Sequence, residues 1–364
     1  GFASPTSHHA MLRDEIRVGA YRRAIERHCR GKRVLEIGCG TGVLSLFAAR
    51  AGAVSVDAIE ESTIAALAEK MFAANLAVGA PVHLHRGNSR DVTLETPAEV
   101  LIHELFGTDP FDENVLPALA DARGRLLAEG GRMLPQRLDV ACVGVDPGTQ
   151  IIDRAKMLDE ANTYAVRYGL DFSPWFTHLR DATSEPLRVV LNDRATPPIV
   201  LTEECPLFSI DFERDDLSAL AVVAPPSLVP REAGTIRAIW LYFRAWFDDE
   251  IVLSTAPDAE LTHWGRDLRS FPVPVEAKVG VAIALDAHIE SPFGRQRLRL
   301  DLTRDETLHL LAQQRCDARH EFGHVHDVRQ VDGGEGAERS VMDHVRVGDR
   351  QDHARFVLAD PLIE

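Results

Sequence analysis

The pattern of apolar and polar positions is clearest between Lys32 and Glu60. It predicts a strand over 34–37, a glycine loop over 38–42, a helix over 43–51 and a strand over 54–59. Elements in this order bind a nucleoside cofactor at the carboxyl edge of a parallel sheet. Gly38 and Gly40 let the backbone approach the ligand, and Glu60 is placed to accept hydrogen bonds from both ribose hydroxyls.

Two residues of this stretch indicate which nucleoside is bound. The dinucleotide pattern requires a third glycine where this chain has Val43, and the acidic Glu36 before the loop is unfavourable beside a pyrophosphate. Both features favour S-adenosylmethionine, whose sulfonium and ammonium groups are cationic. A dinucleotide enzyme and a purely structural strand–helix turn are the alternatives.

The flanking segments extend the same parallel sheet. Their periodicity predicts helices over 8–28, 62–77 and 116–127 and strands over 81–85 and 100–103. Ser62 is the expected N-cap of the second helix, and Gly130-Gly131 is an expected turn. The loop 87–91 is placed to reach the adenine, and an acidic loop over 104–113 follows at the same sheet edge as the glycine loop.

The sequence pattern changes after Pro135. Short runs of alternating apolar and polar residues predict an antiparallel barrel or sandwich. The expected strands are 137–145, 186–191, 206–212, 235–247, 250–255, 278–290 and 295–302. An aromatic, partly helical insertion over 150–178 is either an arm that contacts a partner subunit or a helical cover over the barrel. Beyond it, 304–314 reads as a helix.

Composition restricts the class of function. The net charge of −16 argues against a general nucleic-acid binder and suits a cationic acceptor, although an acidic surface also serves solubility. No apolar run is long enough to span a membrane, and no secretory signal is visible. Five scattered cysteines read as free thiols, so we expect a cytoplasmic protein. Lysine occupies only positions 32, 70, 156 and 278, a bias typical of GC-rich bacterial genomes.

Five segments together resemble the protein arginine methyltransferase family. They are HHAMLRDEIRVGAYRRAI, VLEIGCGTGVLSLFAARAGA, AIEES, HELFGTDPFDE and LTHW, in the family's order across 8–303. The resemblance implies a cofactor-covering helix over 1–30, a Rossmann-like class I S-adenosylmethionine methyltransferase domain over 31–135 and a β-barrel substrate domain over 136–303. It also implies a helical dimerisation arm near 150–178, a homodimer, and a C-terminal extension over 304–364.

The acidic loop carries the chemistry that this resemblance implies. Glu104 and Glu113 stand at the spacing of the family's two glutamates. Two carboxylates can hold a planar guanidinium by charge-assisted hydrogen bonds and aim one terminal nitrogen at the sulfonium methyl. Either glutamate can take the released proton. Asp14 and His263 resemble the pair that orients the active-site loop.

The remaining roles follow from matching positions. Arg17 resembles the arginine that binds the cofactor carboxylate, and His8 the histidine that begins the first helix. The expected cofactor-binding residues are Met11, Arg17, Glu36, Gly38, Gly40, Glu60, Ser89 and Arg90. The expected acceptor-binding residues are Met11, Glu104, Glu113 and Trp264. No metal is expected; Cys316, His320, His324 and His326 have ligand-like spacing but read as solvated.

Three departures from the family pattern affect the prediction. The N-terminal tyrosine pair is missing, Arg90 replaces the adenine-binding glutamate, and the acidic loop looks like that of the monomethylating branch. We therefore expect monomethylation of a terminal guanidino nitrogen. A compact acidic chain without a docking module favours free L-arginine, or a related small guanidine of bacterial natural-product metabolism, as acceptor.

Other acceptors and roles stay open at this point. One alternative is a protein or peptide arginine, and a second is a non-catalytic scaffold of the same fold. The scaffold is disfavoured because it has no need of both Glu104 and Glu113. A DNA-base methyltransferase is disfavoured because its Asn/Asp-Pro-Pro-aromatic loop is absent where Glu104 stands.

Overall fold

A computed structural model describes residues 4–77, 80–148, 163–164, 166–175, 188–191, 196–291 and 294–303. All of them belong to one compact unit, Gly1–Cys316. The second unit, Asp317–Glu364, lies outside the described residues, as do the expected helix over 304–314, the Cys316–His326 cluster and most of the arm.

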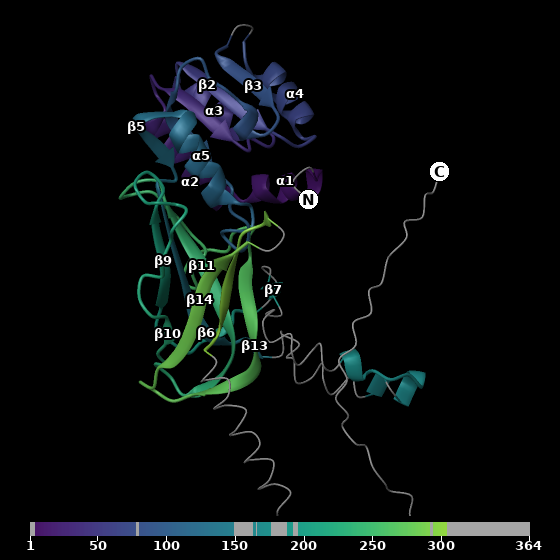
Figure 1. Cartoon of the computed structure of the whole chain (residues 1–364). Coiled ribbons are helices and arrows are strands. Elements are labelled where there is room, and N and C mark those ends of the chain that lie inside the picture. The colour runs from purple at the N-terminus through teal and green to yellow at the C-terminus, as the bar shows by residue number, and fades with distance from the viewer. Residues whose placement is uncertain are drawn as a thin grey trace, which may run out of the picture. The chain divides into compact units, whose positions relative to one another are not determined.

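A five-stranded parallel sheet forms the N-terminal half, with strand order β3-β2-β1-β4-β5 (Figure 1). Its strands are β1 (Arg33–Ile37), β2 (Ser55–Glu60), β3 (Val82–Arg86), β4 (Ala98–His103) and β5 (Leu127–Leu134). The two central strands, β1 and β4, are buried almost throughout, as expected for strands covered on both faces. The chain order reverses at β1, so a ligand crevice is expected at its carboxyl end.

The helices beside this sheet are α3 (Val43–Ala51), α4 (Ala65–Asn75), α5 (Val115–Arg125) and the short 3-10 helix η1 (Ser89–Asp91) (Figure 1). The bounds of α3 confirm the prediction, but α4 begins three residues after the expected cap Ser62. The Glu60 carboxylate binds the Ser62 N–H, and the Ser62 hydroxyl accepts from Ile64 N–H instead. Ser62 therefore organises a turn before α4.

The predicted helix over 8–28 is two helices, α1 (Pro5–Arg13) and α2 (Glu15–His28). Asp14 separates them, with a non-helical ψ of 87°. Its carboxylate accepts a hydrogen bond from Arg17 N–H at 2.9 Å and so caps α2. A single helix was wrong because hydrophobic periodicity continues across the capping aspartate.

The C-terminal half consists of two antiparallel sheets. The larger has the order β7-β13-β11-β6-β8, with β12 beside β11 and β9 beside β6; the smaller has the order β10-β14-β15. The strands are β6 (Arg137–Asp146), β7 (Arg188–Leu191), β8 (Ile199–Val200), β9 (Cys205–Asp211), β10 (Ser227–Leu228), β11 (Gly234–Trp246), β12 (Val252–Ser254), β13 (Arg266–Ala277), β14 (Ile283–Glu290) and β15 (Arg297–Leu302). Leu241 of β11 and Leu300 of β15 share one core with Leu35 of β1, so the sheets enclose a barrel-like interior continuous with the parallel sheet.

Two strands differ from the predictions because they contain glycine or proline, which usually mark turns. Gly130 and Gly131 lie within β5, not in a turn, where the pairing with β4 shifts register. Strand β13 was not expected because it contains Pro272 and Pro274. Both prolines fall between Ser270 and Val275, where the pairing with β11 is interrupted, so no ladder N–H is lost.

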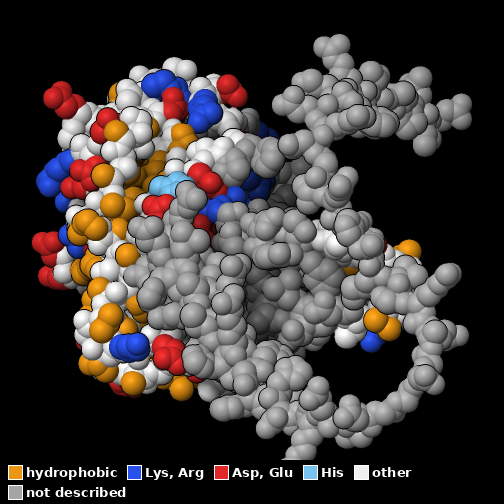
Figure 2. Space-filling view, turned by 60° about the horizontal axis from the view of Figure 1, so that its bottom comes forward, with side chains coloured by type: hydrophobic (Ala, Val, Ile, Leu, Met, Phe, Trp, Pro, Cys, Tyr) orange, Lys and Arg blue, Asp and Glu red, His pale blue; other side chains and the backbone are white. Residues whose placement is uncertain are grey.

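The surface in Figure 2 mixes acidic, basic and hydrophobic side chains over its described part, without a continuous basic stripe. Within the described ranges, no helix has the length and hydrophobicity to cross a bilayer.

Candidate active site

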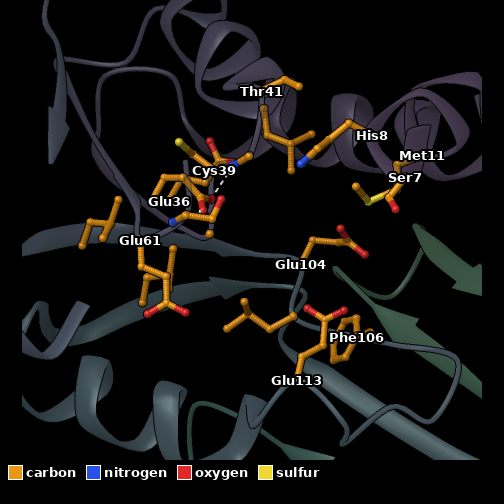
Figure 3. A pocket seen from close by; sticks show the side chains of 18 of the residues that line it. Ser7, His8, Met11, Glu36, Cys39, Thr41, Glu61, Glu104, Phe106 and Glu113 are labelled. Atoms are coloured by element: carbon orange, nitrogen blue, oxygen red, sulfur yellow. Dashed lines mark hydrogen bonds between the residues drawn. The ribbon is translucent and has the colours of Figure 1, made fainter. Parts of the chain in front are cut away.

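A cavity of about 710 Å³ opens at the carboxyl edge of the parallel sheet. The segments that follow β1, β2, β3 and β4 line it, and α1 and the loop before β13 contribute further side chains. Figure 3 shows His8 and Met11 reaching it from α1, and Glu113 extending toward Glu104. Every predicted site residue except Asp14 lines this cavity.

The glycine loop needs glycine for two reasons. Gly38 and Gly40 have φ of +71° and +55°, a region that other residues rarely adopt. A Cβ at position 40 would also lie 2.7 Å from Cε1 of His8, so a larger residue would displace α1. The loop thus holds the backbone close to the ligand space while α1 covers it.

Glu60 is fixed by backbone donors. Its Oε2 accepts from Gly40 N–H at 2.9 Å and its Oε1 from Ser62 N–H at 2.8 Å. Each oxygen retains a lone pair, so the carboxylate is oriented yet can still accept from ribose hydroxyls.

Glu61 also lines the cavity, although the sequence analysis did not single it out. The amide of Asn88 donates to its Oε2 at 2.7 Å. Its position directly after Glu60, at the end of a buried strand, could have indicated from the sequence that Glu61 lines the cavity. Beside it, Ser89 is buried and Arg90 is exposed in the short helix that follows β3.

Glu36 lies fully buried beneath the glycine loop. Burial raises the pKa of its carboxyl to about 8, although a hydrogen bond from the Ser45 hydroxyl favours the ionised form. A cationic ligand above it would favour that form further. The site therefore suits a sulfonium or ammonium group better than a pyrophosphate.

Arg17 pairs with one of the two catalytic candidates. Its Nη2 donates to Oε2 of Glu104 at 2.6 Å, and both side chains are about nine-tenths buried. The predicted partner of Arg17 was the cofactor carboxylate. The structure adds Glu104 as a partner of Arg17. This ion pair balances the charge of Arg17 and orients the carboxylate of Glu104.

Glu113 faces Glu104 from the other end of the acidic loop (Figure 3). Burial raises the pKa of its carboxyl to about 8, and the negative charges of Glu104 and Asp112 contribute to the shift. Two partly buried acids at one cavity wall are poised to receive a cation.

Asp14 joins the N-terminal helices to the loop that carries His263 and Trp264. Its Oδ2 accepts from His263 N–H at 2.8 Å and lies 2.9 Å from Nδ1 of the same residue. Burial alone would raise the pKa of Asp14, but hydrogen bonds from His263 and Arg17 outweigh burial and lower it. Trp264 is buried, and its Nε1 donates to Phe106 O at 2.8 Å, which ties this loop to the acidic loop.

These features fit S-adenosylmethionine. Glycines at positive φ leave backbone space, Glu60 offers oriented acceptors for a ribose, and the buried Glu36 favours a cation. Among the described residues, no cluster of three or more His, Cys, Asp or Glu side chains could hold a metal ion.

Comparison with known proteins gives the same picture. Residues 151–303 match the family model described as the arginine methyltransferase oligomerization subdomain. The chain is 30% identical over 300 residues to "Probable protein arginine N-methyltransferase 6.1" of Oryza sativa subsp. indica, covering 74% of this chain and 77% of that protein. It is also 30% identical to protein arginine N-methyltransferase 1 of Dictyostelium discoideum, covering 76% and 79%.

This chain belongs to the protein arginine methyltransferase family. The family assignment confirms the predicted enzyme class, an S-adenosylmethionine-dependent methyltransferase that acts on arginine.

Solved structures confirm the predicted fold. The Trypanosoma brucei PRMT1 enzyme–prozyme heterotetrameric complex with AdoHcy superimposes with a TM-score of 0.69 at 24% identity, covering 83% of this chain and 95% of that one. Arabidopsis thaliana protein arginine methyltransferase 10 superimposes with the same TM-score at 20% identity, covering 82% and 98%.

Proposed function

We propose that this enzyme methylates a terminal guanidino nitrogen of arginine within a protein or peptide. The observation that carries the proposal is the meeting of Glu104 and Glu113 in the cavity that also holds the glycine loop. S-adenosylmethionine, when bound, supplies an electrophilic methyl group on a cationic sulfur.

The two glutamates bind and aim the acceptor. Arginine's guanidinium is planar and always protonated, so it offers a fork of donors that a carboxylate can accept pairwise. Glu104 is oriented by Arg17, and Glu113 extends toward it from the other end of the acidic loop (Figure 3). Together they hold one terminal nitrogen in line with the methyl group, and positioning of this kind provides a large part of a rate enhancement.

Glu113 is placed to accept the released proton. The positive charges of the bound acceptor and cofactor favour its ionised form before transfer, and transfer removes the charge of the cofactor. Because burial raises the pKa of the Glu113 carboxyl to about 8, it can then take up the proton. Glu104 lies 2.6 Å from Nη2 of Arg17, which holds its carboxylate in place. We assign electrostatic clamping to Glu104, and clamping plus proton acceptance to Glu113.

The choice of acceptor revises the sequence-based expectation of free L-arginine. Relatives that are 30% identical over most of their length are named protein arginine N-methyltransferases, which supports arginine in a polypeptide. The net charge of −16 favours a basic substrate segment of the kind in which arginines cluster. We retain a single methyl addition as part of the proposal because the acidic loop, ELFGTDPFDE, resembles that of the monomethylating branch.

Mass spectrometry of reactions with S-adenosylmethionine tests both points. An arginine-rich peptide is expected to gain one methyl group per modified arginine, while equimolar free L-arginine stays unmodified. Methylation of free arginine with an unchanged peptide would contradict the proposed acceptor. A second methyl on the same arginine would contradict monomethylation and leave the acceptor class intact.

We also propose a homodimer assembled through the arm. Residues 151–303 match an oligomerization subdomain, and the described part of the arm exposes Val166, Tyr168 and Leu170 to 88%, 57% and 63%. Apolar side chains this exposed are unusual unless another surface covers them. Light scattering is expected to give twice the chain mass; a monomer at micromolar concentration would contradict this.

A further inference from the structure

A fully buried charge cluster holds the centre of the acidic loop. Asp109 belongs to this loop, whereas Arg269 and Asp267 belong to β13. Nη2 of Arg269 lies 3.0 Å from Oδ2 of Asp109 and 3.1 Å from Oδ2 of Asp267. All three side chains are exposed to 4% or less. Burying three charges carries a large desolvation penalty, so the geometry of this cluster is tightly constrained.

The cluster attaches the loop to β15. Oδ2 of Asp109 accepts from Leu298 N–H at 3.0 Å, and Nη1 of Arg269 donates to Leu298 O at 2.5 Å. Oδ1 of Asp109 accepts from Phe111 N–H at 3.0 Å, which shapes the loop itself. Asp109 and Arg269 therefore engage both backbone groups of one barrel residue.

A second tether follows directly after Glu113. Asn114 has a φ of +58°, and its Oδ1 accepts from Gln296 N–H at 2.8 Å. Glu113 thus lies between two attachments to the same end of β15, through Asp109 and through Asn114. Neither Asp109 nor Arg269 lines the cavity, so any effect they have on the acceptor must pass through the loop.

We propose that Asp109 and Arg269 are positioning residues that set the separation of Glu113 from Glu104. The inference rests on the proposed function, in which these two glutamates hold one guanidinium. Glu104 directly follows β4 and is oriented by Arg17. Glu113 is placed from two sides, because α5 begins two residues after it and the loop before it is attached to the barrel through Asp109. Since β13 begins two residues after Trp264, the same cluster also connects Glu113 to the loop that carries Trp264.

The test compares Asp109→Asn with Asp267→Asn. Each variant removes one of the two carboxylates that face the same arginine, at almost the same distance, but only Asp109 lies in the acidic loop. We expect Asp109→Asn to lower kcat/KM for an arginine peptide by roughly tenfold to a hundredfold, as small misplacements of reacting groups do. Affinity for S-adenosylmethionine should stay unchanged, because neither residue contacts the glycine loop or Glu60. Asp267→Asn should lower the melting temperature comparably while kcat/KM stays near that of the wild type.

Equal kinetic losses in the two variants, or unchanged kinetics in Asp109→Asn, would overturn the positioning role. If Asp109→Asn fails to fold, Arg269→Lys provides the test, since it keeps the positive charge but loses the planar fork that joins Asp109 to Leu298 O. Unchanged peptide kinetics in that variant would equally overturn the role. Peptide affinity, measured by calorimetry in the same variants, separates this inference from the proposed function. A wild-type enzyme that methylates no peptide contradicts the proposed function, whereas weakened peptide binding confined to Asp109→Asn still supports the positioning role.

Discussion

At Glu113, burial and the nearby Glu104 and Asp112 raise the pKa of the carboxyl to about 8. Below that pH the side chain is protonated in the ligand-free enzyme and offers a guanidinium only one good acceptor. Ionisation above it adds a charge-assisted hydrogen bond. The affinity for an arginine peptide should therefore rise with pH and level off at or above pH 8.

Glu113→Gln tests this titration directly. Glutamine mimics the protonated acid, so peptide affinity should match that of the wild type at pH 6 and be roughly tenfold weaker at pH 9, in line with a charged hydrogen bond of about 1.5–3 kcal/mol. Isothermal titration calorimetry with S-adenosylhomocysteine present measures it. Exposed Glu95→Gln is the matched control. A ratio of affinities that does not change with pH would contradict the assignment.

The raised pKa of Glu113 also affects the stability of the fold. A carboxyl with a raised pKa in the folded state stabilises the fold most below its unfolded pKa, near 4.5, and that contribution is lost as pH rises through about 8. Clamping a cation thus requires a charge that destabilises the empty site.

Residues within one segment could be predicted from the sequence, and residues that meet only in the fold could not. Glu104 and Glu113 lie in one loop and were found together. Arg269 and Asp109 are 160 positions apart, and neither carries a recognisable pattern. Their pairing depends on the register of β13, which the sequence did not reveal.

At the scale of elements, the junction between α1 and α2 depends on Asp14. Asp14→Ala removes the cap of α2 and both hydrogen bonds to His263. We expect a loss of about 2–3 kcal/mol in the free energy of unfolding, together with lower kcat because the loop carrying Trp264 is no longer tethered. Urea unfolding and peptide kinetics measure the two effects. Glu15→Ala, an exposed acid at the next position, is the control; equal losses in both variants would contradict the tether.

Regular elements were the most predictable part of the fold. The helix α3 and the strands β1 to β4 of the parallel sheet were predicted from their apolar patterns, whereas β5 was not. The break between α1 and α2 at Asp14 and the strand β13 could not be predicted in the same way. The effect of a capping residue or of a proline within a strand depends on its tertiary partners. Asp14 needs His263 nearby, and Pro272 and Pro274 need the interrupted pairing with β11.

At the scale of the whole molecule, Asp248 joins α2 to the antiparallel half. Its Oδ2 lies 3.0 Å from Nη1 of Arg27 and 2.8 Å from Nε2 of His28. Burial opposes its ionisation, but the hydrogen bonds from His28 and from the N–H groups of Glu250 and Ile251, with the charge of Arg27, lower its pKa below the usual value. A lowered pKa stabilises the fold above pH 4, and this contribution is lost as pH falls through the folded-state pKa.

Asp248→Asn should therefore lower the free energy of unfolding by about 1 kcal/mol at pH 7, a modest value because solvent screens the partly exposed Arg27. The difference from the wild type should shrink below pH 4. Thermal unfolding across this pH range measures it, with exposed Asp249→Asn as control. A difference that grows in acid would contradict the ion pair's role.

We propose that two glutamates from one loop hold the acceptor guanidinium beside the cofactor. Methyl transfer to an arginine peptide by Glu104→Gln, measured alongside S-adenosylmethionine affinity by calorimetry, tests this role. We expect turnover to fall at least about a hundredfold, since an oriented charge that aims the nucleophile is lost, while the cofactor still binds. Turnover in Glu104→Gln close to that of the wild type would contradict the account.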